Sequence, residues 1–212
     1  MSNIQVLLVD DHEVVRAGYR RLLENTIGIK VIAEAKSGEE AYFGYMKHKP
    51  DVVIMDLSMP GMSGLEATRK IRHYDDTARI LVFSVHENES FLLRALDEGI
   101  LGYITKRSAA KVMVEAVRQV AQNKEFIGQE LHSFLAKNRA SGHNPLFDRI
   151  SSREFEVFLL LAEGKTVNEI AEILTLSSKT VGHHYTHLKN KLKVSNMAEL
   201  ARLAIREGVL EP

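Results

Sequence analysis

The sequence predicts an α/β domain with a doubly wound, five-stranded parallel sheet, followed by a smaller domain that is entirely helical. In the first half, short aliphatic runs alternate with stretches of helical periodicity, whereas no strand-like run follows residue 123 or so. The 212 residues also exceed the length of a typical single domain, about 100–150 residues. We expect a first domain at residues 1–123, a linker with a helix at 124–148, and a second domain at 149–212.

The expected strands are short and almost wholly apolar, as is typical of parallel strands that are buried on both faces. They are predicted at residues 4–9, 30–33, 52–55, 80–83 and 101–104. Helical spacing of apolar residues places the intervening helices at about 13–24, 38–48, 64–73, 89–98 and 109–122. In a sheet of this kind, ligands bind at the carboxyl ends of the strands.

The linker and the second domain are predicted from helical periodicity and capping signals. Residues 125–137 carry apolar residues at helical spacing, and the polar stretch 138–145 predicts a flexible joint. Ser151, Thr166 and Asn196 each stand three positions before a glutamate, a pattern that caps a helix N-terminus. The helices of the second domain are therefore expected at about 152–163, 167–174, 178–192 and 196–207.

The composition excludes several classes of protein. Cysteine is absent, which rules out disulfides and thiolate metal sites and fits a reducing compartment. The longest apolar run, Val157–Ala162, is far shorter than the ~20 residues of a membrane helix, and no signal peptide begins the chain. The 28 basic and 28 acidic residues balance, so the net charge indicates no partner. We expect a cytoplasmic protein that does not contact a membrane.

Polar side chains follow several of the predicted strands at the point where each strand ends. Asp10 and Asp11 follow the first strand, Asp56 the third and Ser84 the fourth, and Lys106 comes just after the fifth. These groups should meet at one edge of the sheet, where carboxylates in proximity repel unless a cation joins them. A few hard oxygen ligands suit Mg²⁺. A lysine and a hydroxyl next to such a site would bind a phosphoryl group that a carboxylate attacks.

This set of residues resembles the flavodoxin-like receiver domain of two-component response regulators. The resemblance is carried by Val9-Asp10-Asp11, by Met55-Asp56 with the loop 59–64, and by Ser84 and Lys106. It implies that Asp56 accepts a phosphoryl group from a sensor histidine kinase, and that Ser84 and Lys106 bind the phosphoryl oxygens. The catalytic residues would thus be Asp56, which is the phosphoacceptor, together with Lys106 and Ser84.

The same resemblance implies a Mg²⁺ site and a conformational switch. The metal would be held by Asp11, Asp56 and the carbonyl of Ser58, with Asp10 assisting through water. The switch would consist of a hydroxyl and an aromatic ring that swings inward as the hydroxyl moves, at Ser84 and Tyr103.

The predicted helix 178–192 has one apolar face, and its other faces are polar and basic. Val181, Tyr185, Leu188 and Leu192 recur at steps of three and four, which predicts that they are buried. The stretch between Ser177 and Met197 contains four lysines and no acidic residue. Because a short helix and a tight turn precede it, the segment fits a helix-turn-helix whose second helix enters the DNA major groove.

The second domain resembles the LuxR-type helix-turn-helix, so nearly the whole chain resembles the NarL/FixJ family of response regulators. The matching motifs are Ser152-Arg153-Glu154, Glu169-Ile170-Ala171, Thr180-Val181 with His184, and Lys191-Leu192. Carried over residue by residue, the resemblance implies base contacts by Gly182, His183 and Thr186. It implies contacts to the DNA backbone by Lys179, Thr180, His187, Lys189 and Lys191. Gly182 departs from the family pattern, which usually has a polar or basic residue there.

We therefore expect a transcription factor, not an enzyme, whose binding to double-stranded DNA is controlled by phosphorylation of Asp56. A single helix-turn-helix contacts few base pairs, so a homodimer on paired half-sites is expected. The alternative keeps DNA binding but makes the receiver a phosphorylation-independent dimerisation scaffold. Two further hypotheses are a metal-dependent phosphohydrolase that uses Asp56, and C-terminal helices that bind a protein instead of DNA.

Overall fold

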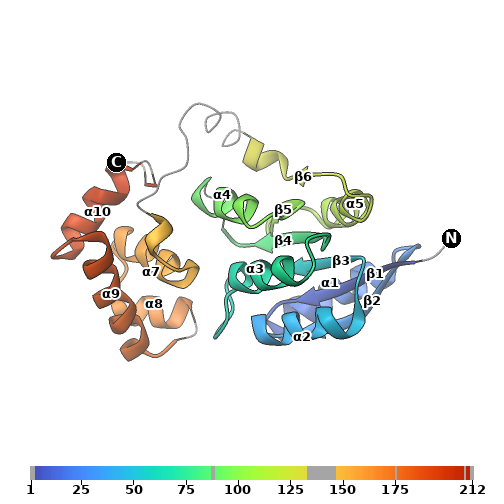
Figure 1. The fold of residues 1–212 in the computed structure, drawn as a ribbon, viewed down its shortest axis with the longest axis horizontal. Helices are drawn as coiled ribbons and strands as arrows, with labels where there is room; N and C mark the ends of the chain where they lie inside the picture. The colour runs from blue at the N-terminus through green and yellow to red at the C-terminus, as the bar shows by residue number, and fades with distance from the viewer. Residues whose placement is uncertain (1–2, 87–88, 133–146, 175, 208, 211–212) are drawn as a thin grey trace. The chain divides into compact units, whose positions relative to one another are not determined.

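The computed structural model describes residues 3–86, 89–132, 147–174, 176–207 and 209–210 (Figure 1). The chain divides into two compact units, Met1–Ala136 and Lys137–Pro212. Within the described ranges, no helix has the length and apolar character that crossing a membrane requires. The predicted joint at 138–145 lies outside the described residues.

The first unit is a doubly wound α/β domain, as predicted. Its strands are β1 (Ile4–Val9), β2 (Ile29–Ala35), β3 (Val52–Met55), β4 (Ile80–Ser84), β5 (Gly102–Thr105) and β6 (Phe126–Ile127). The intervening helices are α1 (Glu13–Glu24), α2 (Gly38–His48), α3 (Gly64–Tyr74), α4 (Glu89–Asp97) and α5 (Ala110–Ala121). All strands pair in parallel in the order β2-β1-β3-β4-β5-β6. Among the described residues the sheet thus has six strands, one more than predicted.

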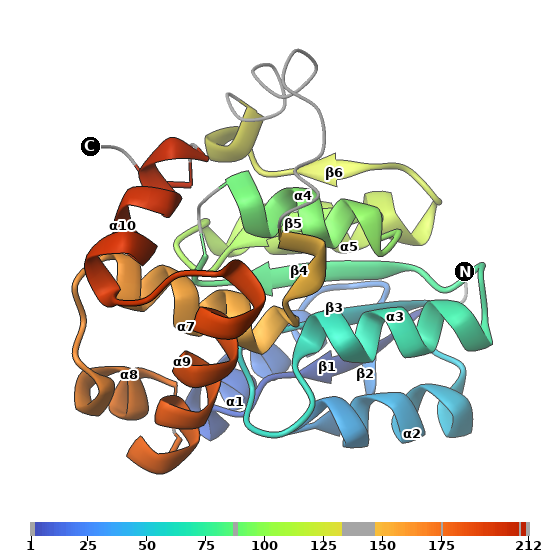
Figure 2. The ribbon, with the colours of Figure 1, turned by 60° about the vertical axis from the view of Figure 1, so that its left-hand side comes forward.

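Helices cover both faces of this sheet (Figures 1 and 2). One face buries alternate residues of the strands, such as Leu8 and Ile54, together with Leu23 of α1 and Val117 of α5. On the opposite face, α2 packs over Leu7 and against α3. Because the central strands are covered on both sides, their residues are apolar in succession and their polar residues come at the strand ends.

The sixth strand replaces the beginning of the linker helix that we expected. Phe126 pairs with Gly102 and Ile127 with Tyr103, and a 3₁₀ turn, η1 (Gln129–Leu131), follows. The prediction of a helix over 125–137 is therefore wrong for 126–131, and 133–137 lies outside the described residues. The apolar residues of this segment fit a helix or a strand. Pairing as a strand satisfies the backbone N–H and C=O groups along the edge of β5, whereas a helix there would leave them exposed.

The second unit contains four α-helices in its described part. They are α7 (Ser152–Ala162), α8 (Val167–Ile173), α9 (Ser178–Leu192) and α10 (Met197–Arg206), preceded by a 3₁₀ turn, η2 (Phe147–Arg149). The four predicted helices are confirmed. Their shared core is apolar and includes Phe155, Phe158, Val181, Leu188 and Leu200, each fully buried.

Capping side chains start these helices as the sequence indicates. Ser151 and Thr166 each form a reciprocal capping box with the glutamate three residues later. Asn196 accepts a hydrogen bond from the Glu199 N–H at 2.9 Å, whereas the Glu199 carboxylate binds the N–H of Ser195. Caps of this kind contribute about 1 kcal/mol each and mark the helix boundaries.

Candidate functional site

The ends of β1, β3 and β5 bring a lysine between two buried carboxylates. Asp10 and Asp56 are each 1% exposed, and the N–H of Asp56 donates to the carbonyl of Val9, which places the two strand ends side by side. Nζ of Lys106 lies 2.7 Å from Oδ2 of Asp10 and 2.7 Å from Oδ2 of Asp56. Ser84, which is fully buried, ends β4 and pairs in register with Thr105. The structure therefore gathers these predicted site residues at one edge of the sheet.

The buried position of Asp56 sets its protonation behaviour. Burial raises the pKa of Asp56 to about 6, although Lys106 favours the charged form. Burial would lower the pKa of Lys106, but the Asp56 and Asp10 carboxylates outweigh it and hold the pKa above its ordinary value. At neutral pH the site therefore contains an ionised carboxylate, which is the form that acts as a nucleophile, and a charged ammonium.

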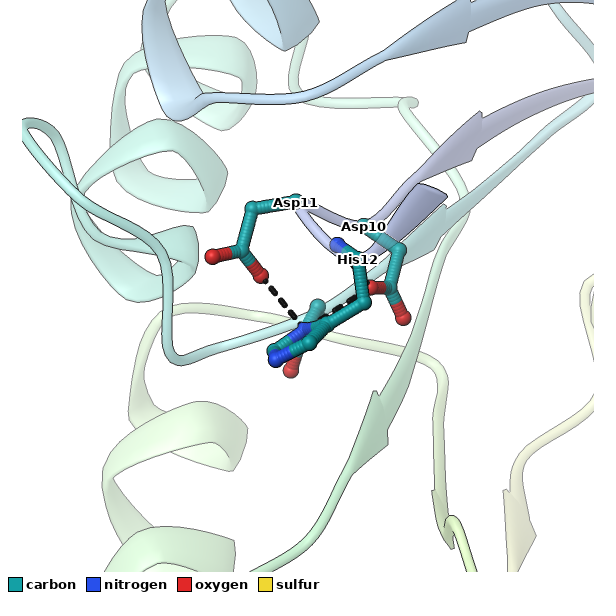
Figure 3. A group of neighbouring side chains, drawn as sticks. Asp10, Asp11 and His12 are labelled. Atoms are coloured by element: carbon teal, nitrogen blue, oxygen red, sulfur yellow. Dashed lines mark hydrogen bonds and ion pairs between the residues drawn. The ribbon is translucent and has the colours of Figure 1, made fainter. Parts of the chain in front are cut away.

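Asp10, Asp11 and Asp56 also form a cluster with metal-ligand spacing. One ligand atom from each, together with one from His12, lies within 4.8 Å of the others. Figure 3 shows the His12 imidazole beside both neighbouring carboxylates, with Nδ1 2.9 Å from Oδ1 of Asp11 and 3.4 Å from Oδ1 of Asp10. Three carboxylates at this distance are a hard-oxygen donor set that fits Mg²⁺. Sequence reasoning missed His12, although its position directly after Asp11 signals it.

The loop between β3 and α3 is shaped around Asp56. The N–H of Ser58 lies 3.4 Å from Oδ1 of Asp56, and Ser63 caps α3 through the N–H of Glu66. A Cβ at Gly64 would lie 1.9 Å from the carbonyl oxygen of Asp56, so a residue without a side chain is required there. This loop therefore holds the Ser58 backbone next to the Asp56 carboxylate; the contact is made by the N–H, whereas the predicted metal ligand is the carbonyl.

His86 connects the two predicted switch residues with the β3–α3 loop. Its N–H donates to the Ser84 hydroxyl at 3.2 Å, and its carbonyl accepts a hydrogen bond from the Tyr103 hydroxyl at 2.9 Å. Nε2 of His86 lies 2.7 Å from the Ser58 hydroxyl, and its ring stacks on Phe91 with centroids 3.8 Å apart. Tyr103 is fully buried. The sequence did not predict this connection, because it joins residues from separate loops.

The candidate DNA-binding residues lie on the surface of α9, away from its buried face. Val181, Leu188 and Leu192 are buried as expected, whereas Tyr185 is only partly buried and has Nζ of Lys189 5.1 Å from its ring centroid. The exposed candidates are Lys179, His183, Thr186, His187 and Lys191, and the partly exposed ones are Thr180, Gly182 and Lys189. The exposed set recurs at helical spacing and forms one accessible face.

Several of these candidates make contacts within the unit, among them Thr186 and Lys191. The hydroxyl of Thr186 donates to the carbonyl of Gly182 at 2.9 Å. Nζ of Lys191 lies 2.7 Å from Oε2 of Glu154, a buried carboxylate at the start of α7. The preceding residue, Arg153, is also buried and binds Glu156 and the carbonyl of Leu174. Through its bond to the Leu174 carbonyl, Arg153 anchors the end of α8, just before the turn into α9.

The first unit is an α/β domain with a buried acidic site at the carboxyl edge of its parallel sheet, and the second is a helix-turn-helix. Residues 6–118 match the family model described as the response regulator receiver domain, and residues 148–204 match the model of the luxR family of bacterial regulatory proteins. The chain belongs to the NarL/FixJ family of response regulators. It is a two-component response regulator with a LuxR-type DNA-binding domain.

Similar proteins match over almost the whole chain. It is 40% identical to the response regulator UvrY of Escherichia coli K12 over 97% of this chain and 95% of UvrY. It is 37% identical to the response regulator GacA of Pseudomonas aeruginosa over 98% of each chain. Among solved structures, RcsB of Salmonella typhimurium is 30% identical, with a TM-score of 0.62 over 96% of this chain and 98% of RcsB. An RcsB–DNA complex is 29% identical, with a TM-score of 0.61 over 95% of this chain and 97% of that chain.

Proposed function

We propose that this protein is a transcription factor whose binding to double-stranded DNA is controlled by phosphorylation of Asp56. The observation that carries the proposal is the position of Lys106 Nζ, 2.7 Å from both Asp10 and Asp56. In the transfer, an Asp56 oxygen attacks the phosphorus of a kinase phosphohistidine. The new P–O bond forms as the P–N bond breaks, and the imidazole leaves with its electron pair.

Asp10, Asp11 and Asp56, with the carbonyl of Ser58, would hold a Mg²⁺ ion. The bound ion supplies positive charge that offsets the charge of the phosphoryl oxygens. Lys106 would donate a hydrogen bond to a phosphoryl oxygen, and Ser84 would offer its hydroxyl from the end of β4. The carboxylate of Asp56 is thereby oriented toward the incoming group and its product is held in place.

An apolar hollow beside Lys106 supports a protein as the phosphoryl donor. This open hollow has a volume of about 400 Å³ and is lined by residues of α1, among them Val14, Val15 and Leu22, and by Lys106 and Ala110. Val14 is 85% exposed, an unusual position for a large apolar side chain. An exposed apolar patch next to a reactive site favours docking of a partner such as a sensor histidine kinase.

The phosphoryl group would change the conformation through the contacts of Ser84. It adds a charge of about −1.5 to −2 and three acceptor oxygens. When the Ser84 hydroxyl turns toward these oxygens, it leaves the N–H of His86, whose carbonyl binds the hydroxyl of Tyr103. Phosphorylation would therefore shift the population toward a state with altered positions of His86 and Tyr103.

DNA contact is proposed for the exposed face of α9. Lys179 and His183 lie on this face together with Gly182, which leaves space for close approach. A homodimer would place two such helices on paired half-sites. Phosphate contacts predict a steep salt dependence of affinity, with a slope of about 0.9 for each phosphate neutralised.

The test is a DNA-binding titration of the wild type and Asp56→Asn, each with and without a small phosphodonor and Mg²⁺. We expect the phosphodonor to change the affinity of the wild type and to leave Asp56→Asn unchanged. Mass spectrometry of the same samples should detect an acyl phosphate in the wild type. Equal affinity in all four samples would contradict phosphorylation control and favour the scaffold alternative.

A matched pair of charge variants tests the DNA-binding face. Lys179→Ala removes an exposed charge from α9, and Arg202→Ala removes an exposed charge from α10. We expect Lys179→Ala to reduce the salt slope by about 1 and Arg202→Ala to leave it unchanged. A flat salt dependence in the wild type would instead favour a protein partner.

A further inference from the structure

The carboxylate of Glu130 binds both ends of the turn that carries Lys106. Its Oε1 accepts hydrogen bonds from the Thr105 hydroxyl at 3.0 Å and from the Ser108 hydroxyl at 2.7 Å. These two hydroxyls also lie 3.3 Å from each other, and the N–H of Ser108 donates to the carbonyl of Thr105. Glu130 therefore closes a small hydrogen-bonded ring in which Lys106 is one of the enclosed residues.

The position of Glu130 is determined by the strand that the sequence did not predict. The N–H of Gly128 donates to the carbonyl of Tyr103 at 2.8 Å, directly after β6 pairs with β5. The next turn, η1, buries Leu131 completely. Glu130 lies between these two fixed points, so its side chain is directed back over Gly128, where an added Cβ would lie 2.8 Å from Oε1.

The turn held by Glu130 carries Lys106 into the site. Lys106 extends from it toward Asp10 and Asp56, and the N–H of Lys106 donates to the carbonyl of Ser84 at 2.8 Å. Thr105 is 1% exposed, so its hydroxyl requires a partner, and Glu130 provides one. Partial burial would raise the pKa of Glu130, but its own backbone N–H and the Ser108 and Thr105 hydroxyls outweigh this and hold the pKa below its ordinary value.

We propose that Glu130 is a positioning residue for phosphorylation: through Thr105 and Ser108 it orients the Lys106 turn from a segment that follows the last helix of the receiver. The inference rests on the proposed phosphorylation of Asp56. It makes the reactivity of Asp56 depend on the segment that continues toward the DNA-binding unit.

The experiment compares Glu130→Ala and Glu130→Gln with the wild type in phosphorylation by phosphoramidate in the presence of Mg²⁺. Glutamine retains an Oε1 acceptor, whereas alanine removes it. We expect Glu130→Ala to lower the maximal phosphorylation rate about fivefold, the effect of one net hydrogen bond, without changing the half-saturating Mg²⁺ concentration. Glu130→Gln should stay within about twofold of the wild type. Glu125→Ala removes the same charge from an exposed position in the same segment and should have no effect.

The outcomes separate this role from a structural one and from the proposed function. An unchanged maximal rate in Glu130→Ala, with a lower melting temperature, would mean that Glu130 only stabilises the fold and would overturn the proposal. An equal loss in Glu130→Ala and Glu125→Ala would assign the effect to charge and also overturn it. If the wild type gains no phosphoryl group while folded, the proposed function fails and the inference fails with it. A third result would reject the inference alone. In that case the wild type is phosphorylated, Asp56→Asn is not, and Glu130→Ala is phosphorylated at the wild-type rate.

Discussion

Lys191 of α9 forms an ion pair with Glu154 of α7, with Nζ 2.7 Å from Oε2 and 2.9 Å from Oε1. Glu154 is 3% exposed and also accepts a hydrogen bond from the N–H of Ser151 at 2.7 Å, so it serves the cap of α7 as well. The pair links the C-terminal end of the candidate DNA-binding helix with the first turn of α7. Lys191 is therefore engaged within the protein, in contrast to Lys179 at the other end of α9.

This contact predicts different effects for two lysines on the same helix. Lys191→Met keeps the apolar stem but leaves Glu154 with fewer partners, so we expect the second unit to lose about 1 kcal/mol of stability. Lys179→Met should leave stability unchanged and reduce the salt slope of DNA binding by about 1. Urea denaturation followed on the methyl NMR signals of Val181 and Leu188 measures the first effect. A salt slope that falls equally in both variants would contradict a structural role for Lys191.

The second unit should lose stability in acid in two steps. Burial lowers the pKa of His184, so its stabilising neutral form is fully present above the unfolded pKa of 6.5 and is lost as pH falls below it. Burial alone would raise the pKa of Glu154, but the Lys191 hydrogen bond and the Ser151 N–H lower it. Glu154 therefore contributes to the stability of the second unit above its unfolded pKa of 4.5, and this contribution is lost as the pH falls below that value.

The two steps can be separated by substitution. Urea midpoints measured between about pH 2.5 and 8 should show a decline starting near pH 6.5 that His184→Asn removes. Glu154→Gln should lower stability at neutral pH and flatten the decline that starts near 4.5. An unaltered pH profile in either variant would show that another group titrates in that range.

Gly182 predicts opposite effects on stability and on DNA binding. An added Cβ there meets no heavy atom within 4 Å, so Gly182→Ala should stabilise α9 by up to about 1 kcal/mol. If the backbone at Gly182 approaches DNA, the same methyl group weakens binding. Gly18→Ala in α1 is a matched control, because its Cβ also meets nothing within 4 Å. It should stabilise the first unit and leave DNA affinity unchanged; equal DNA affinity of Gly182→Ala and the wild type would reject the close approach.

Tyr103→Phe tests the link between Tyr103 and His86. The substitution keeps the buried ring and removes the hydroxyl that donates to the His86 carbonyl. We expect the first unit to lose about 1 kcal/mol of stability, the net value of one buried hydrogen bond. Tyr42→Phe on α2, where the tyrosine is partly exposed, is the control. A smaller loss in Tyr103→Phe than in the control would show that the hydroxyl contributes little.

Magnesium should stabilise the first unit through the three carboxylates. At a concentration 100 times the dissociation constant, binding to the folded state contributes about 2.7 kcal/mol. Asp11→Asn should abolish this gain, and it should be more stable than the wild type without the metal, because one like charge is removed from the cluster. Thermal melts with Mg²⁺, and with K⁺ at equal ionic strength, measure both effects. A gain that persists in Asp11→Asn would place the ion elsewhere.

The carboxylate cluster was predictable because parallel strands place their carboxyl ends at one edge of a sheet. Asp10, Asp56 and Lys106 follow strands whose apolar character is evident, and the structure places Nζ of Lys106 2.7 Å from a carboxylate oxygen of each aspartate. The boundaries of α1, α2 and α9 agree with the predicted ones, since apolar spacing and, in α2 and α9, a serine cap act locally. The partners of Lys191 and His86 were not predictable, because each contact joins residues from different elements.

The secondary structure of segment 126–131 could not be predicted from the local sequence pattern. Its apolar residues suit a helix or a strand, and the unpaired edge of β5 selects the strand, which then carries Glu130 to the Lys106 turn. Residue types and their spacing settle the class of fold, the helix ends and the groups that carry chemistry, since those depend on neighbours along the chain. Other features depend on packing between distant segments, and only the folded chain establishes those contacts. They are the extension of the sheet beyond β5, the pairing of Lys191 and the support of the Lys106 turn by Glu130.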